Sequence, residues 1–195
     1  VDTSAEGVAV SSYNTMDSHS SSTINLENVF VTEANLIVDE GEGFRHIESC
    51  LPQILLCLSA EALGIMEVLN RLTVEYSKTR KQFGAPIGSF QALQHRMVDN
   101  FMAFEQSKSM VYRGICESTS FNKNDIDINQ FLKTAHAVKA LIAKNSKQIG
   151  DESIQIHGGI GMTDELNIGH FVKRLMMINV LFGDGDFHRQ CFSQN

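Results

Sequence analysis

The pattern of apolar and polar positions divides the chain into two parts near residue 40. Residues 8–13 and 23–31 alternate between apolar and polar side chains, and residues 15–22 between them are mostly Ser, Thr, Asp and His. Alternation with a period of two, bounded by small polar residues, predicts strands with one buried face. Two strands alone are marginal in water, so we expect them to need a partner sheet or a helical layer.

From residue 43 the apolar positions recur at helical spacing. Over residues 47–72 they follow steps of three and four for about seven turns, and a second apolar face predicts burial on two sides, as for the central helix of a bundle. Pro52 falls near the start, where a proline costs least. Amphipathic helices are also predicted over about residues 89–118, 128–154 and 164–180, the first with an apolar stripe of Phe90, Leu93, Met97, Phe101 and Phe104.

The connections between these predicted helices are short, which makes neighbouring helices antiparallel. The predicted fold is therefore mainly α, an antiparallel four-helix bundle preceded by a short β-strand segment. We expect residues 1–40 to be the end of a β-domain and residues 41–195 to be a helical bundle domain.

Composition narrows the class of protein. With 43% hydrophobic residues the chain of 195 residues is not a disordered one, and its two prolines suit long helices. A net charge of −7 argues against nucleic acid as the main partner. We expect no membrane span, since no unbroken apolar run approaches ~20 residues. The first residues show no signal peptide, which favours the cytoplasm.

The cysteines and histidines are dispersed. Four cysteines without a C-x-x-C pair predict reduced and mostly buried thiols, and seven histidines show no metal-binding spacing. We therefore expect neither a disulfide framework nor a metal site.

Two segments could bind a ligand. The first segment is Arg80-Lys81-Gln82-Phe83-Gly84, followed by Phe90-Gln91. Its arginine, amides and aromatic ring could hold a phosphate and a planar group. A structural alternative is an arginine that complements the helix dipole, with Phe83 plugging the turn. The second segment is glycine-rich and reads Gln155-Ile156-His157-Gly158-Gly159-Ile160-Gly161. A ligand could approach its backbone closely, and the structural alternative is a tight turn between two helices.

A third segment, residues 182–188, places Asp184 and Asp186 close to His188. Acids beside a histidine suggest acid/base chemistry or a metal, although the remaining positions of a calcium loop are absent. The structural alternative is a turn that ends a helix.

Together these segments resemble the C-terminal half of the acyl-CoA dehydrogenase flavoprotein family. The resemblance is carried by Arg80-x-Gln82-Phe83-Gly84-x-Pro86-Ile87-x-x-Phe90-Gln91, by Gln155-x-His157-Gly158-Gly159-x-Gly161 and by the turn at residues 182–188. The start of the long helix at residues 41–44 and the strand that ends at Val31 also match the family. The resemblance covers essentially the whole chain.

The resemblance implies an FAD shared between two subunits. Arg80, Gln82 and Phe83 would meet its pyrophosphate and adenine end across the interface, with Gln91 nearby. Gln155, Gly158 and Gly159 would contact the adenosine part. The implied reaction is α,β-dehydrogenation of an acyl-CoA thioester, in which a carboxylate takes the α-proton and the flavin takes the β-hydride. An electron-transfer acceptor would reoxidise the flavin.

The sequence departs from the family at the catalytic base. The family's Glu lies in a Tyr-Glu-Gly-Thr turn, which here reads Leu181-Phe182-Gly183-Asp184, so its position is Phe182 or Gly183. The other position that the family uses, a Glu followed by Arg on the first long helix, is occupied by Ile54 and Leu55. Asp184 is displaced and shorter than Glu, and is a weak candidate for the base.

Three hypotheses follow. The first is a flavin-sharing subunit of a heteromeric enzyme, whose partner subunit supplies the base, as in bacterial relatives. The second is an active homo-oligomer that uses Asp184, and the third is a flavin-free helical module that only oligomerises. The family's N-terminal helical domain and most of its middle β-domain would precede residue 1. We therefore expect this chain to be a fragment that is inactive on its own. Its two strands should be its most mobile part or should pair with another chain.

Overall fold

A computed structural model describes residues 1–194 of the chain. The contacts between residues separate two compact units, Val1–Cys50 and Leu51–Asn195, and each unit is considered by itself. The predicted boundary between residues 40 and 41 stays a prediction.

The first unit contains an antiparallel hairpin. Strands β1 (Val8–Asn14) and β2 (Ser20–Leu26) pair with Val8 opposite Leu26 and Asn14 opposite Ser20. Strand β2 ends five residues earlier than predicted, and the expected buried face is wrong, because Ile24 and Leu26 are more than half exposed. A two-stranded hairpin has no second layer of its own against which to bury a face. A short 3₁₀ helix, η1 (Glu33–Asn35), follows.

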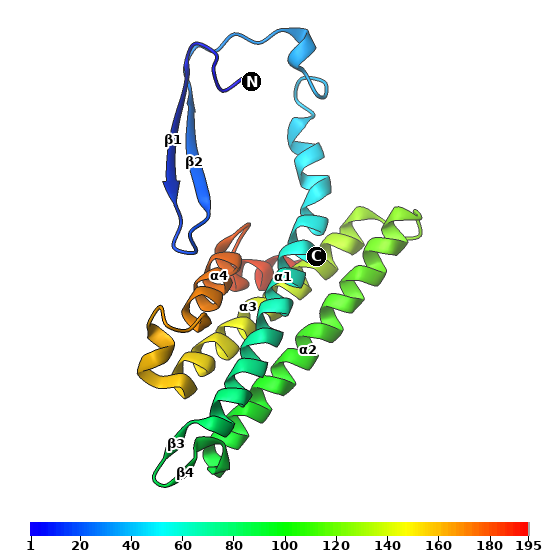
Figure 1. Cartoon of the computed structure of the whole chain (residues 1–195). Helices are drawn as coiled ribbons and strands as arrows, with labels where there is room; N and C mark the ends of the chain where they lie inside the picture. Colours follow the sequence, from blue (N-terminus) through cyan, green and yellow to red (C-terminus); the bar gives the residue numbers. More distant parts are fainter. Residues whose placement is uncertain (195) are drawn as a thin grey trace. The chain divides into compact units, whose positions relative to one another are not determined.

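The second unit holds the helices. Their bounds are α1 (Gly43–Thr79, beginning in the first unit), α2 (Gln91–Asn122), α3 (Ile128–His157), α4 (Ile168–Val180) and α5 (Gly185–Gln194). Two-residue strands β3 (Lys81–Gln82) and β4 (Ala85–Pro86) and the 3₁₀ helix η2 (Ile87–Ser89) join α1 to α2, and η3 (Gly158–Met162) follows α3. The predicted mainly α fold with four long antiparallel helices is confirmed, and α5 is an addition that the sequence pattern did not predict (Figure 1).

Helix α3, and not α1 as predicted, is the central helix of the bundle. It packs against α2, α4 and α5, and about half of its residues are buried. Helix α1 buries one stripe of residues, which includes Leu55, Met66 and Leu69. A bidentate ion pair, in which Arg174 Nε and Nη2 lie 2.6 and 2.8 Å from the carboxylate oxygens of Glu61, also joins α4 to α1.

The buried stripe of α2 differs from the predicted one. Phe101, predicted to be buried, is 58% exposed, whereas Asn100, Ser107 and Gly114 face the core. Two causes account for this difference. The small residues permit a close approach of α1, since a Cβ at Gly114 would lie 2.7 Å from a methyl of Leu56. The buried polar groups find partners, and Asn145 Nδ2 of α3 donates to Ser107 Oγ and to the Ala103 carbonyl, at 3.0 Å each.

The cysteines correct another expectation. Cys50, Cys57 and Cys116 are exposed and Cys191 is half-buried, so the predicted burial of most thiols is wrong. Their apolar neighbours in the sequence lie on helices, and a helix presents only one face to its core.

Among the described residues, α1 is long and apolar enough to cross a membrane by length and composition alone. The sequence pattern had not predicted this. A core helix of a soluble protein meets the same two criteria, and a third of the apolar stretch of α1 is buried inside the protein.

Candidate functional site

The segment after α1 forms a two-residue hairpin whose turn presents an aromatic side chain. Lys81 pairs with Pro86 and Gln82 with Ala85, which leaves Phe83 and Gly84 in the turn, both with positive φ (53° and 81°). Positive φ at both central residues is typical of a type I′ turn, and it strains a residue with a bulky side chain. Phe83 is nevertheless 94% exposed, so the alternative in which it plugs the turn is wrong.

Polar groups surround this turn. The backbone N–H of Ile87 donates to the Arg80 carbonyl at 2.8 Å and closes the base of the hairpin. The side chains of Arg80, Gln82 and Gln91 are exposed, and Phe90 meets the ring of Phe83 edge-on, with centroids 6.2 Å apart. The hairpin and the first residue of α2 therefore present a guanidinium, two amides and an aromatic face to solvent.

The glycine-rich segment lies at the end of α3. Gly158 caps the helix with φ 66° and ψ −147°, a conformation that favours glycine. Gly158 and Gly159 are exposed, and a Cβ built on either would have no neighbour within 4 Å. The backbone of these glycines is therefore open to a ligand, while Gln155 is exposed in the last helical turn.

His157 anchors this segment to α1. It is buried, its ring stacks on that of Tyr76 with centroids 4.4 Å apart, and its Nδ1 lies 2.7 Å from the Ser153 carbonyl oxygen. The Tyr76 hydroxyl donates to the His157 carbonyl at 3.4 Å. His157 is thus a structural residue of the turn.

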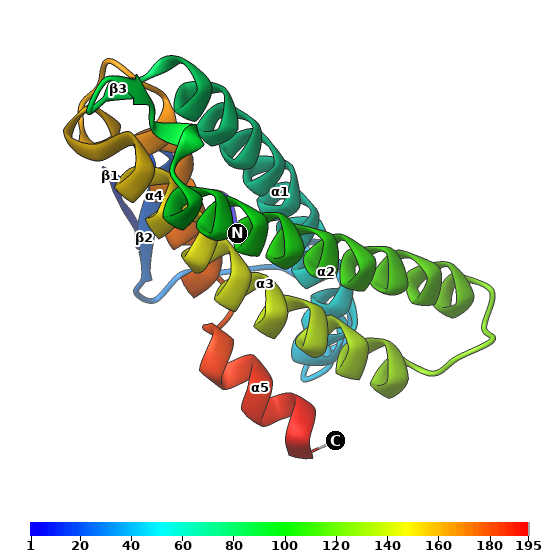
Figure 2. The same ribbon diagram turned by 90° about the horizontal axis from the view of Figure 1, so that it is seen from below.

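Both segments lie at the same end of the bundle, where α1 and α3 finish and α2 begins (Figures 1 and 2). The structure thereby brings one group of sequence-predicted residues to one region, and we call them the end cluster: Arg80, Gln82, Phe83, Gln91, Gln155, Gly158 and Gly159. A cavity of about 390 Å³, lined by Tyr76 and His157 among others, opens beside it.

The turn between α4 and α5 holds the remaining predicted residue, Asp184. Its Oδ1 accepts from the backbone N–H of Phe187 at 2.8 Å, as an N-cap of α5 does. Phe182 and Gly183 before it have positive φ (59° and 110°), and Phe182 is 53% exposed.

Under this turn lies a buried lysine. The Nζ of Lys139, on α3, donates to the carbonyl of Ile178 at 2.6 Å and to that of Gly183 at 3.4 Å. The residue is fully buried, and this burial lowers its pKa to about 8 although the charge of Asp184 opposes the shift. Lys139 thus ties the last turn of α4 and the following loop to α3.

Two buried histidines complete this cluster. The Nδ1 atoms of His136 and His188 lie 2.8 Å apart, so one ring donates a hydrogen bond to the other. Burial, and after it the neighbouring charges of His136 and Lys139, lowers the pKa of His188 to about 4. His188 Nε2 is buried and has no hydrogen-bond partner among the described residues.

Sequence reasoning did not single out Lys139 or His136, and both are buried. A signal was present. Lys139 follows Ala135 by four positions and precedes Ile142 by three, so it belongs to the buried stripe of α3. From Lys139 to His157 the helix runs about 27 Å at 1.5 Å per residue, which separates this cluster from the end cluster.

Comparison with known proteins decides the family. Residues 41–195 match the family described as "Acyl-CoA dehydrogenase, C-terminal domain". This chain belongs to the acyl-CoA dehydrogenase family. The resemblance recognised in the sequence is thereby confirmed.

Individual relatives of known sequence or structure support the same family assignment. The chain is 28% identical to the short-chain specific acyl-CoA dehydrogenase of Megasphaera elsdenii, over 88% of this chain and 43% of that protein. It is 30% identical to the probable acyl-CoA dehydrogenase YngJ of Bacillus subtilis, over 97% of this chain and 49% of that one. A structure titled "PigA with FAD and proline" superposes with a TM-score of 0.87 at 25% identity, covering all of this chain and half of the other.

The chain thus spans about half the length of the acyl-CoA dehydrogenases that it matches. The structure places no carboxylate at the positions that the sequence resemblance assigns to the base of this family. Phe182 and Gly183 form the strained part of the turn, Ile54 is half-buried and Leu55 is fully buried.

Proposed function

We propose that this chain is the C-terminal part of an FAD-dependent acyl-CoA dehydrogenase and acts as a flavin-sharing subunit, whose partner subunit supplies the catalytic base. The observation that carries the proposal is a contrast within one chain. The end cluster is open and equipped for a phosphate and a planar ring, whereas the one carboxylate of the turn at residues 181–184, that of Asp184, caps α5.

The end cluster fits the proposed cofactor. Arg80 offers a planar fork of donors to the pyrophosphate, with the amides of Gln82 and Gln91 nearby. Phe83 presents almost its entire ring for stacking, and the open space above Gly158 and Gly159 lets their backbone approach the adenosine. When bound, FAD supplies the hydride acceptor for the oxidation of an acyl-CoA thioester.

The strain at Phe83 supports a binding role for this residue. An aromatic residue with φ 53° costs of the order of 1–3 kcal/mol, and such conformations cluster at ligand sites. An Asn at this position of a type I′ turn would be the unstrained choice. Since Phe83 makes its only ring contact among the described residues with Phe90, packing within the chain does not account for the strain.

The partners in this proposal are an acyl-CoA substrate, a second subunit and an electron-transfer acceptor. The second subunit completes the flavin site and holds the base. The cytoplasm of a bacterium is the proposed location.

The alternative, an active homo-oligomer, requires Asp184 to act as the catalytic base. Its carboxylate already caps α5 through the N–H of Phe187, a role that holds the side chain against the helix terminus. A carboxylate in this role is poorly placed to take a proton from a substrate. The contact therefore favours a base on the partner subunit.

Flavin retention tests the cofactor site. The chain is purified together with its partner subunit, and bound FAD is measured by its visible absorbance. We expect Arg80→Met to lower FAD affinity about 10- to 100-fold, because it removes a charge-assisted hydrogen bond. Arg113→Met is the matched control, since Arg113 is an exposed arginine of α2 that pairs with Glu117. Full retention of FAD by Arg80→Met would count against the site, and absence of flavin from the complex would favour the flavin-free module.

A second experiment tests where the base lies. Asp184→Asn keeps a side chain that caps α5 and removes the carboxylate. We expect unchanged acyl-CoA turnover in the assembled enzyme, and no turnover by the 195-residue chain alone. A loss of 100-fold or more in Asp184→Asn, the range typical of a missing acid–base group, would assign the base to Asp184 instead.

A further inference from the structure

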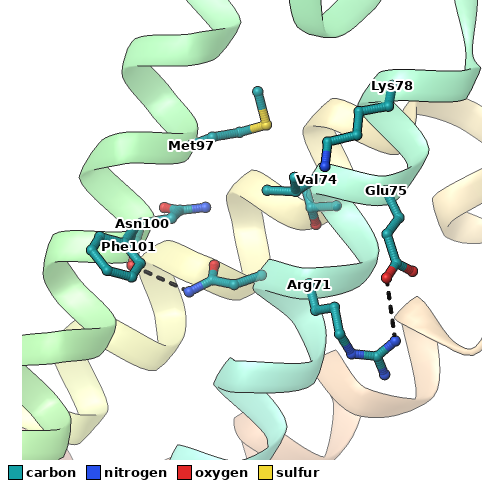
Figure 3. A pocket seen from close by; sticks show the side chains of 9 residues that line it. Arg71, Val74, Glu75, Lys78, Met97, Asn100 and Phe101 are labelled. Carbon is teal, nitrogen blue, oxygen red and sulfur yellow. Dashed lines mark hydrogen bonds and ion pairs between the residues drawn. The ribbon is translucent and has the colours of Figure 1, made fainter.

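A second cavity lies between α1 and α2, apart from the end cluster. Its volume is about 300 Å³, at the lower end of the range for small-molecule sites. Figure 3 shows that α1 contributes Arg71, Val74, Glu75 and Lys78 to it, and that Asn100 lies across the gap on α2.

Two buried polar atoms at this cavity have no hydrogen-bond partner among the described residues. They are Thr73 Oγ1 and Asn100 Nδ2, on residues that are 1% and 2% exposed. The carbonyl groups of Asn100 are engaged, since its backbone oxygen accepts from Asn70 at 3.4 Å and its side-chain oxygen from Gln148 at 3.5 Å. Its amide nitrogen points across the gap toward α1 (Figure 3). A buried donor left unpaired costs free energy, so an acceptor at this place would be favourable.

The charges at the cavity favour an anion. Arg71 and Glu75 form an ion pair with 3.6 Å between Nη1 and Oε1, and so neutralise each other. Lys78 has no such pair within residues 1–194, and its side chain folds back along α1 toward Val74 (Figure 3). One unbalanced ammonium, one amide donor and one hydroxyl therefore surround the same space.

The other walls are apolar. Val74, Met97 and the ring of Phe101 line the remaining side of the cavity. A ligand that matches this arrangement has an anionic acceptor at one end and a short hydrocarbon part at the other. A carboxylate offers two acceptor oxygens, enough for Lys78 and Asn100 together.

We propose that the α1–α2 cavity is a binding site for a small aliphatic monocarboxylate, held by Lys78, Asn100 and Thr73. The site is independent of flavin and of the proposed reaction. The carboxylate accepts from the Lys78 ammonium and the Asn100 amide, the Thr73 hydroxyl donates to it, and the chain of the ligand lies against Met97 and Phe101.

Hexanoate is a suitable probe, because its tail is short enough for the cavity. Binding to the 195-residue chain is measured by saturation-transfer NMR and calorimetry, with 1-hexanol as the uncharged control. We expect saturable binding of hexanoate with a dissociation constant in the millimolar range, and at least tenfold weaker binding of hexanol. Failure of hexanoate to bind would overturn the proposal. This holds also if another molecule, such as a second copy of the chain, covers the cavity.

Variants locate the site. Lys78→Met keeps the aliphatic stem and should weaken hexanoate binding about tenfold, and Thr73→Val keeps the shape and should weaken it about threefold. Lys123→Met, at the exposed C-cap of α2, is the charge-matched control and should bind like the parent chain. Circular dichroism verifies that each variant is folded. Equal binding by Lys78→Met and Lys123→Met would overturn the assignment.

Discussion

At the scale of single residues, Lys139 is a fully buried amine in the core of the bundle. A charged lysine inside a helical bundle is unfavourable unless its protons are used, and here they reach the carbonyls of Ile178 and Gly183. The Ile178 carbonyl lies in the last turn of α4 and the Gly183 carbonyl in the loop after it, where backbone acceptors lack helical partners. The lysine thus does for this helix end what a C-terminal capping motif does elsewhere.

The lowered pKa of Lys139 predicts a stability change with pH. The folded-state pKa of about 8 lies below the value of about 10.5 in the unfolded chain, so between these values the unfolded state binds more protons. The penalty of burying the charge is therefore complete below pH 8 and disappears as pH rises toward 10.5. We expect Lys139→Met to lack this rise, which amounts to at most about 3 kcal/mol in the wild-type chain. Urea unfolding of both proteins from pH 7 to 10.5 measures the difference, and parallel curves would contradict it.

The two neighbouring glycines of the end cluster make a matched pair of substitutions. Gly158 has φ 66° and Gly159 has no positive φ, while both have open space at their Cβ positions. Gly158→Ala should lower the free energy of unfolding by about 1–3 kcal/mol, and Gly159→Ala should change it by less than about 0.5 kcal/mol. Thermal unfolding monitored by circular dichroism compares them. If the glycines approach FAD, Gly159→Ala will weaken flavin retention in the assembled enzyme without this loss of stability.

At the scale of elements, α5 is attached to the bundle by ionisable groups. His188 lies fully buried against His136 of α3, with Lys139 and Asp184 nearby. The sequence indicated only a turn in this region, because ten residues with a short apolar stripe give a weak helical signal. Docking on α3 supplies the burial that a short helix needs, since an isolated helix of this length is unstable in water.

Acid should release α5. The pKa of His188 is about 4 when α5 is docked and about 6.5 when it is free, so the free form binds more protons between these values. Docking therefore weakens as pH falls from 6.5 to 4. We expect the hydrogen-exchange protection of the α5 amides to fall by up to about 100-fold between pH 7 and 4.5, relative to α3.

A His188→Gln variant controls this experiment, because glutamine does not titrate in this range. Its α5 protection should depend on pH less than that of the parent chain, because only the buried His136 then gains a proton on release of α5, and it should be lower throughout. Equal pH dependence in the variant and the parent chain would show that another group controls the release.

At the scale of the whole molecule, the two units differ in how much they bury. Fifteen residues of α3 are buried, whereas the strands of the N-terminal hairpin are almost entirely exposed. Backbone hydrogen bonds without a buried face open easily.

Hydrogen exchange should separate the two units. Amides of β1 and β2 are expected to exchange with protection below about tenfold, and those of the core of α3 with protection of 1,000-fold or more, because a lone hairpin is marginal in water. Mass spectrometry of the 195-residue chain after peptic digestion measures both in one sample. Strong protection of the hairpin would mean that another surface, such as that of a second copy, covers it.

Four of the five α-helices and the class of protein could be predicted from the amino-acid sequence. Helical spacing of apolar residues located the four long helices, because the period of a helix is a local property of the chain. The residues of the end cluster, Arg80 to Gln91 and Gln155 to Gly159, could also be identified, since their residue types and spacing carry the family resemblance.

The identity of the central helix and the surroundings of each buried polar group became clear from the packing of the helices. Phe101 of α2 turned outward and Asn100 inward because small side chains such as Gly114 let α1 approach and Gln148 of α3 donates a hydrogen bond to the Asn100 side chain. Lys139, His136 and His188 meet only after α3, α4 and α5 pack together. Burial and pairing depend on neighbours distant in sequence, and local periodicity contains no information about them.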